Sequence, residues 1–145
     1  MNHATKFTMM AAALFIASAS TSAFADAGHA GTAKAHCNAM VETGESGMDH
    51  GGQGHTGTAV KHFKQMAQDG QECLNHGQEA VKSADKGSPT EMHGGGAMKH
   101  VQEAVTHANA AVEHGEAGHN DVMMNHAKEA LMHAKEGNKH AQEMK

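Results

Sequence analysis

The stretch from His93 to Glu143 reads HGGGAMKHVQEAVTHANAAVEHGEAGHNDVMMNHAKEALMHAKEGNKHAQE. Its histidines recur every seven residues in two runs, and five residues separate the runs: His93, His100, His107, His114, and then His119, His126, His133, His140. Seven residues make almost two turns of an α-helix, so each run predicts a nearly straight stripe along one helix face. The short connection through Gly115 and Gly118 predicts a turn between two antiparallel helices.

The apolar residues of this stretch step by three and four, as on the buried face of an amphipathic helix. They are Met98, Val101, Val105, Ala108 and Val112 in the first run, and Met124, Ala127, Leu131, Ala134 and Ala141 in the second, with Asn138 as a polar exception. With Met98 and Met124 at heptad position a, the histidines of the helices fall at position c, beside the seam and directed outward. Histidines satisfied inside a core would occupy a or d, so core packing does not explain the pattern.

The first half of the chain repeats this pattern in a weaker form. A shift of 64 residues overlays six earlier histidines on the later ones: His29, His36, His50, His55, His62 and His76. Thr43 and Asp69 stand where the second copy has His107 and His133. The apolar seam of this copy runs through Val60, Phe63, Ala67, Leu74, Val81 and Ala84. We call the fourteen histidines of the two copies the histidine ladder.

Two helix–turn–helix copies predict an all-α fold, an antiparallel four-helix bundle made of two duplicated helical hairpins. Repeat one covers about 29–84 and repeat two about 93–145. The expected helices cover roughly 28–43, 56–84, 96–115 and 120–143. The five glycines from Gly44 to Gly54 predict a loose turn, and Pro89 with the Gly94–Gly96 triplet predicts a linker over Lys86–Gly96.

Folding each hairpin about its turn brings the two stripes together. In repeat two the level pairs are His114 with His119, His107 with His126, His100 with His133, and His93 with His140. In repeat one they are His50 with His55, Thr43 with His62, His36 with Asp69, and His29 with His76. Successive histidines of one stripe lie about 10.5 Å apart and cannot share an ion. Two histidines on facing helices can share one if both stripes flank the same groove.

Several glutamates accompany the ladder at a spacing of three or four residues. They are Glu103, Glu129, Glu136 and Glu143. Side chains at these spacings are neighbours on a helix surface. A carboxylate there can be a further metal ligand or can orient an imidazole.

The N-terminus has the features of a secretory signal peptide over residues 1–25. Lys6 supplies a positive charge, Phe7–Ala19 is apolar, and Ala23-Phe24-Ala25 is a small-x-small cleavage site. Cleavage would leave residues 26–145 as a helical metal-binding domain in the periplasm. No later segment is apolar enough to span a membrane, so we expect no membrane partner after cleavage.

The two cysteines leave three alternatives open. Cys37 and Cys73 would reach an oxidising compartment, where paired cysteines often form a disulfide. The pairing above places Cys37 level with position 68, about 7.5 Å along the helix axis from Cys73, which is awkward for a disulfide. A disulfide, free thiols and a soft copper site all remain consistent with the sequence.

The composition excludes other functional classes. The 11 basic residues are outnumbered by 16 acidic ones, and Trp and Tyr are absent, so a nucleic-acid partner is not expected. No CxxCH motif for haem occurs, and the ExxH motif from Glu116 to His119 falls at a turn, where it cannot form the di-iron site of a helix bundle. No nucleophile–base arrangement stands out, so we expect no enzymatic activity.

Three motifs carry a resemblance to a known family: AMKHVQEAVTHA from Ala97, EHGEAGH from Glu113, and NHAKEALMHAK from Asn125. This stretch resembles the small metal-binding protein (SmbP) family. The resemblance is close over about 97–143 and loose over 29–84. It implies a periplasmic four-helix bundle that binds several divalent ions, copper foremost, in metal tolerance or sequestration.

Imidazole and carboxylate ligands suit Cu(II), Ni(II) and Zn(II), and intrinsic affinity favours Cu(II). We therefore predict that a monomer binds and sequesters several divalent transition-metal ions, chiefly Cu(II). The predicted ligands are the histidine ladder: His29, His36, His50, His55, His62, His76, His93, His100, His107, His114, His119, His126, His133 and His140.

Two alternatives remain. One is a copper chaperone that delivers its ion to a single partner, and the other is a histidine-rich stress protein that responds to pH. The thioethers of Met48, Met92 and Met132 lie near ladder histidines and could help to hold Cu(I).

Overall fold

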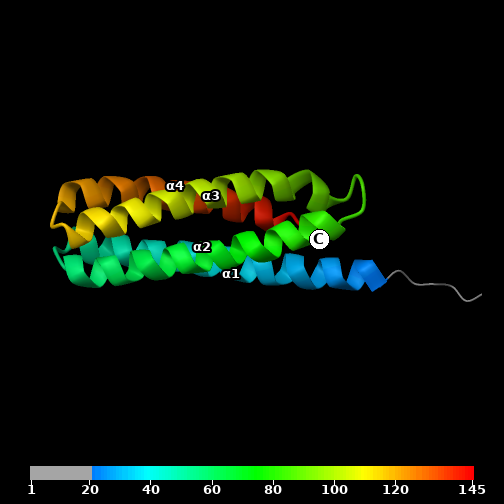
Figure 1. The fold of residues 1–145 in the computed structure, drawn as a ribbon, viewed down its shortest axis with the longest axis horizontal. Helices are drawn as coiled ribbons and strands as arrows, with labels where there is room; N and C mark the ends of the chain where they lie inside the picture. Colours follow the sequence, from blue (N-terminus) through cyan, green and yellow to red (C-terminus); the bar gives the residue numbers. More distant parts are fainter. Residues whose placement is uncertain (1–20) are drawn as a thin grey trace, which may run out of the picture.

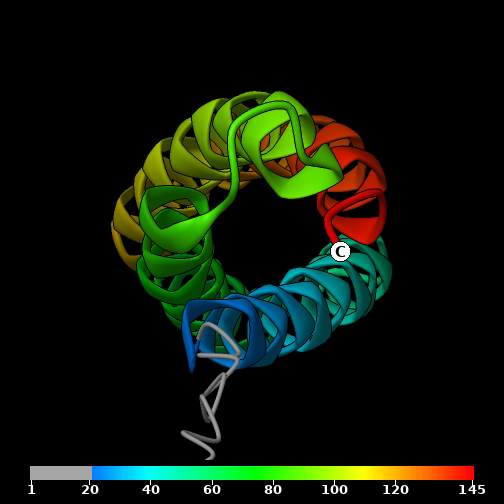
Figure 2. The same ribbon diagram turned by 90° about the vertical axis from the view of Figure 1, so that its right-hand side faces the viewer.

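The computed structural model describes residues 21–145, which form an antiparallel bundle of four helices (Figure 1). The helices are α1 (Thr21–Gly52), α2 (Thr56–Ser83), α3 (Pro89–Glu116) and α4 (Asn120–Gln142). Both hairpin turns lie at one end of the bundle, and the α2–α3 connection lies at the other (Figure 1). Along the bundle axis the helices form a ring in the order α1, α2, α3, α4 (Figure 2). The predicted four-helix bundle is confirmed.

The predicted signal peptide falls almost entirely outside the described part of the chain. Residues 1–20 are not described, and Thr21–Ala25 form the beginning of α1. Within residues 21–145, no helix has the length and apolarity that crossing a membrane requires.

The core is made of small or flexible side chains. Its largest fully buried members include Phe63, Leu74, Met40, Met66 and Met123, and alanines fill much of the remainder. The predicted seam residues Val60, Phe63, Ala67, Leu74, Met98, Val101, Val105 and Ala108 are buried. Val81, Ala84 and Val112 are half-buried at the edges of the core.

Half of the buried positions predicted for α4 are wrong, because the residue that is buried lies one position earlier in the chain. Met123, Ala130 and Gly137 are buried, whereas Met124, Leu131 and Asn138 lie at the edge of the core. Small residues at 130 and 137 let α4 approach its neighbours closely. The bulkier Met124 and Leu131 side chains instead cover Gly51 and Gly44 of α1.

The predicted loose turn over Gly44–Gly54 is also wrong, because α1 continues to Gly52. Gly44 and Gly47 are buried, and Met66 and Phe63 of α2 occupy the space that a side chain at either glycine would need. Burial of these large side chains outweighs the low helix propensity of glycine.

The two hairpin turns have the same geometry. Gly54 and Gly118 take positive φ values of 78° and 77°. The next amide, that of His55 or His119, donates to the carbonyl of His50 or His114 at 2.8 Å. This hydrogen bond closes the helix end in the way that a left-handed glycine permits.

The predicted linker over Lys86–Gly96 is too long, because α3 begins at Pro89. The Ser88 hydroxyl accepts a hydrogen bond from the Glu91 amide at 3.2 Å. In return, the Glu91 carboxylate accepts one from the Gly87 amide at 2.5 Å. This reciprocal cap, with proline in the first turn, starts the helix. The glycine triplet therefore lies inside α3.

The close approach of α3 and α4 at Gly137 gives a stability prediction. A Cβ at this position would lie 3.1 Å from the Val101 nitrogen and 3.2 Å from the Ala97 oxygen, and neither backbone atom can turn aside. We expect Gly137→Ala to lower the free energy of unfolding by about 1–3 kcal/mol. Gly95→Ala is the matched control, since nothing lies within 4 Å of that position in α3. It should raise stability by up to about 1 kcal/mol. Urea unfolding of both variants measures the contrast, and equal effects would contradict the close packing.

Candidate metal centre

The histidine ladder lies along the edges of two helix–helix interfaces. Most of its members immediately precede a buried residue, as His100 precedes Val101 and His133 precedes Ala134. The repeat-one histidines line the α1–α2 groove, and the repeat-two histidines line the α3–α4 groove. The α1–α2 pair and the α3–α4 pair lie on opposite sides of the ring of helices (Figure 2). The two histidines at the turns, His55 and His119, are exposed and the other twelve are half-buried.

The predicted cross-hairpin pairs are present in repeat two. The two Nδ1 atoms are 3.3 Å apart in the His100–His133 pair, 3.1 Å in His107–His126 and 3.5 Å in His114–His119. The rings of His93 and His140 have centroids 6.2 Å apart. Two nitrogens bound to one ion at 2.0–2.1 Å stand about 2.9–3.4 Å apart. The Nδ1 separations of His100–His133 and His107–His126 fall within this range, and that of His114–His119 lies just above it. The stripes therefore flank one groove, and the histidines lie beside the seam as predicted, half-buried at its edge.

The level pairing is only half of the arrangement, because each interior histidine contacts two histidines of the facing helix. His107 also stacks on His133, with centroids 5.9 Å apart and planes 5° apart. His100 stacks on His140 at 6.0 Å, and His114 on His126 at 5.4 Å. The eight rings form one continuous zigzag in the order His119, His114, His126, His107, His133, His100, His140, His93.

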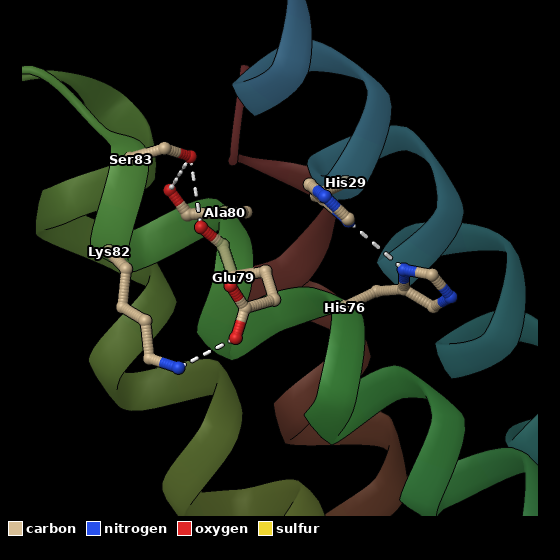
Figure 3. Close-up of polar contacts among 6 residues, drawn as sticks. All are labelled: His29, His76, Glu79, Ala80, Lys82 and Ser83. Carbon is tan, nitrogen blue, oxygen red and sulfur yellow. Dashed lines mark hydrogen bonds and ion pairs between the residues drawn. The ribbon is translucent and has the colours of Figure 1, made fainter. Parts of the chain in front are cut away.

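The zigzag of repeat one is interrupted where two histidines are missing. At one end the His29 and His76 Nδ1 atoms are 3.1 Å apart (Figure 3). His36 stacks on His76 with centroids 5.9 Å apart. Near the turn, the His50 ring stacks on that of His62 at 5.2 Å and lies 5.8 Å from that of His55. Between the two groups the Thr43 hydroxyl lies 2.8 Å from the Ala39 carbonyl of its own helix and 3.3 Å from the Asp69 carboxylate of α2.

Two glutamates complete three-ligand groups in repeat two. Glu143 Oε2 lies 2.7 Å from His93 Nδ1, and His140 completes this group. Glu103 Oε2 lies 3.1 Å from His133 Nδ1 and 3.7 Å from His100 Nδ1. Within each group the ligand atoms all lie within 4.8 Å of one another.

The spacing of the glutamates in the sequence predicts only part of their contacts with the histidines. It places Glu103 beside His100 on its own helix, but the closer contact to His133 crosses the groove and depends on helix packing. Glu129 and Glu136, which the spacing treats in the same way, are exposed and belong to neither group.

Cys37 and Cys73 form a disulfide in the buried core, with Cα atoms 5.3 Å apart. Of the three alternatives left by the sequence, the structure therefore contains the disulfide and not free thiols or a copper site. The level pairing of the histidines predicts that Cys37 lies opposite position 68, which is awkward for a disulfide with Cys73. Each histidine of α1 contacts its level partner or the histidine seven residues further along α2. The facing positions are therefore centred between these two partners. Cys73 lies between position 68, the level partner of Cys37, and position 75, so it is within reach of Cys37.

The methionines considered as Cu(I) ligands differ in their surroundings. Met48 packs against the core. Met92 and Met132 are exposed beside His93 and His133.

Among the described residues, one buried nitrogen of the ladder has no hydrogen-bond partner. His50 Nδ1 is buried and makes no hydrogen bond, although the rings of His55 and His62 lie next to it. An unpaired buried polar atom costs free energy. A metal ion bound at this nitrogen would remove that cost, so the site suits a cation.

The donors of both grooves are imidazoles with occasional carboxylates, which is the ligand chemistry of Cu, Ni and Zn. Residues 90–145 match the small metal-binding protein family. The match spans α3 and α4 and confirms the resemblance of this part of the chain to the SmbP family. No curated protein and no solved structure matches the chain. The SmbP match and the two His/Glu groups together support metal binding.

Proposed function

We propose that the protein binds and sequesters several divalent transition-metal ions, Cu(II) foremost, in the periplasm after removal of residues 1–25. The observation that carries this proposal is the continuous row of eight imidazoles in the α3–α4 groove. The SmbP match over the same helices supports metal as the ligand.

The form of the sites favours sequestration over catalysis. Catalytic metal sites are single, rigidly supported centres with one open position. Here many similar ligands lie half-buried along two helix–helix interfaces, and they form a series of pairs instead of one cage. Such an arrangement suits the uptake of several ions, so we propose no enzymatic role.

Copper is the favoured ion for a chemical reason. Nitrogen and oxygen ligands bind Cu(II) more tightly than the other divalent ions of the first transition row. Both cysteines are held in the disulfide, so the ladder offers imidazole and carboxylate, which suit Cu(II). Zn(II) and Ni(II) use the same ligands with lower intrinsic affinity.

A metal titration tests the proposal. We expect elemental analysis of protein dialysed against Cu(II) to find more than two ions per chain, and the melting temperature to rise with bound copper. An ion that binds only the folded chain adds about 2.7 kcal/mol of stability when its free concentration is a hundred times Kd.

The alternatives give different results in the same experiment. A copper chaperone should hold about one ion, and a pH-responsive stress protein should hold none. Periplasmic fractionation, with mass analysis for a chain that begins at Asp26, tests the location separately.

A further inference from the structure

We propose that the end of the α3–α4 groove remote from the turn holds two adjacent, carboxylate-capped sites that take the first two Cu(II) ions. One site is His93, His140 and Glu143, and the other is His100, His133 and Glu103. We call them the capped pair. This inference rests on the proposed function and specifies which part of the ladder binds most tightly.

The two sites of the capped pair each bring three ligand atoms together, whereas the other histidine pairs of repeat two bring only two. In the second site the three ligand atoms lie 3.1, 3.3 and 3.7 Å from one another, close to the separations around one bound ion. In the first site Glu143 already contacts His93 at 2.7 Å. The neighbouring pairs His107–His126 and His114–His119 bring two imidazoles together without a third ligand from a carboxylate.

Repulsion between two bound divalent ions explains why each of the two adjacent sites needs a carboxylate. The two sites are one heptad apart along the groove, about 10.5 Å, and the His100 and His140 rings that belong to different sites stack at 6.0 Å. Two divalent ions at this spacing repel each other. One negative carboxylate in each site reduces the charge of both filled sites. Rungs with imidazole alone keep the full repulsion.

Repeat one provides a comparison within the same chain, because the glutamate at the capping position forms an ion pair with a lysine. His29 and His76 correspond to His93 and His140, and Glu79 corresponds to Glu143. Lys82 Nζ, however, lies 2.6 Å from the Glu79 carboxylate, which points toward the lysine and not toward the histidine pair (Figure 3). The hydrogen bond from Lys82 and its positive charge lower the pKa of Glu79.

The second capped site has no counterpart in repeat one. Ala39 stands at the position of Glu103, and Asp69 at that of His133. Repeat one therefore lacks a capped site in the protein as it stands.

Chelator competition with Cu(II) on the full mature chain tests the capped pair. Glu103→Gln and Glu143→Gln should each weaken one of the first two ions by at least about tenfold, while Glu129→Gln, an exposed control on α4, should leave both unchanged. Lys82→Ala should release Glu79 and raise the number of tightly bound ions from two to three. If both glutamine variants bind the first two ions like the wild type, or Lys82→Ala adds no tight ion, the inference is overturned.

Electron paramagnetic resonance tests the adjacency of the two sites. With two equivalents of Cu(II), ions about 10 Å apart should broaden each other's spectrum by dipolar coupling relative to the one-equivalent sample, and Glu103→Gln should remove this broadening at that loading. Isolated-ion spectra from the wild type at two equivalents would overturn the capped pair. A wild-type total of several ions would then leave the proposed function standing, whereas a chain that binds none would overturn both.

Discussion

Reduction of the Cys37–Cys73 disulfide is expected to lower the free energy of unfolding by about 4 kcal/mol, because the bond closes a loop with a sequence separation of 36 residues. Loop closure restricts the unfolded chain, and the restriction is lost when the bond is broken. The effect is large relative to the stability of a small domain, which is typically about 5–15 kcal/mol. Here the core depends on alanine and methionine, so the disulfide contributes a substantial share of the stability of the metal-free protein.

Urea unfolding with and without a phosphine reductant measures this contribution. The double variant Cys37→Ala/Cys73→Ala is the control, since its unfolding midpoint should not respond to the reductant. It should resemble the reduced wild type. A reduced wild type that unfolds at the same midpoint as the oxidised protein would show that the disulfide adds nothing to stability.

Removal of His107 or His126 is expected to eliminate the same bound ion. Their Nδ1 atoms are 3.1 Å apart, so each imidazole would lose its partner ligand when the other is replaced. We expect His107→Ala and His126→Ala each to bind one Cu(II) fewer than the wild type, and the double variant also to bind one fewer. The losses from two ligands of one site are not additive.

The matched control is His107→Ala/His140→Ala. His140 belongs to the group with His93 and Glu143, two rungs from the His107–His126 pair. These two losses should add, so this double variant should bind two ions fewer. Elemental analysis after dialysis against Cu(II) counts the ions directly. A loss of two ions from His107→Ala/His126→Ala would show that each histidine binds alone.

The periodicity of the sequence predicts the fold and the grooves well. The seven-residue spacing of His100, His107 and His114 determines one stripe for any straight helix, and the antiparallel turn brings the two stripes of a hairpin together. The Nδ1 distances between the facing histidines confirm this reasoning for most of repeat two.

What sequence reasoning missed depends on partners that lie far away along the chain. Gly44 and Gly47 are poor helix formers, yet they remain helical because Met66 and Phe63 pack against them. Ser88 and Glu91 form a Ser-x-x-Glu capping pattern, and the helix that it starts continues through the glycine triplet.

The position of the disulfide required the register of the first hairpin. That register depends on the turn, where the His55 amide bonds to the His50 carbonyl and Gly54 adopts positive φ. Counting from one histidine to the next does not include this turn geometry, so the level pairing misplaced Cys37 relative to Cys73.

Because the rings in the α3–α4 groove form a zigzag, neighbouring ion sites there compete for the same imidazoles. Each interior histidine has two neighbours, so an ion that uses His107 and His126 withdraws His126 from His114 and His107 from His133. Eight ligands in one row can therefore hold at most four ions that each take two rings.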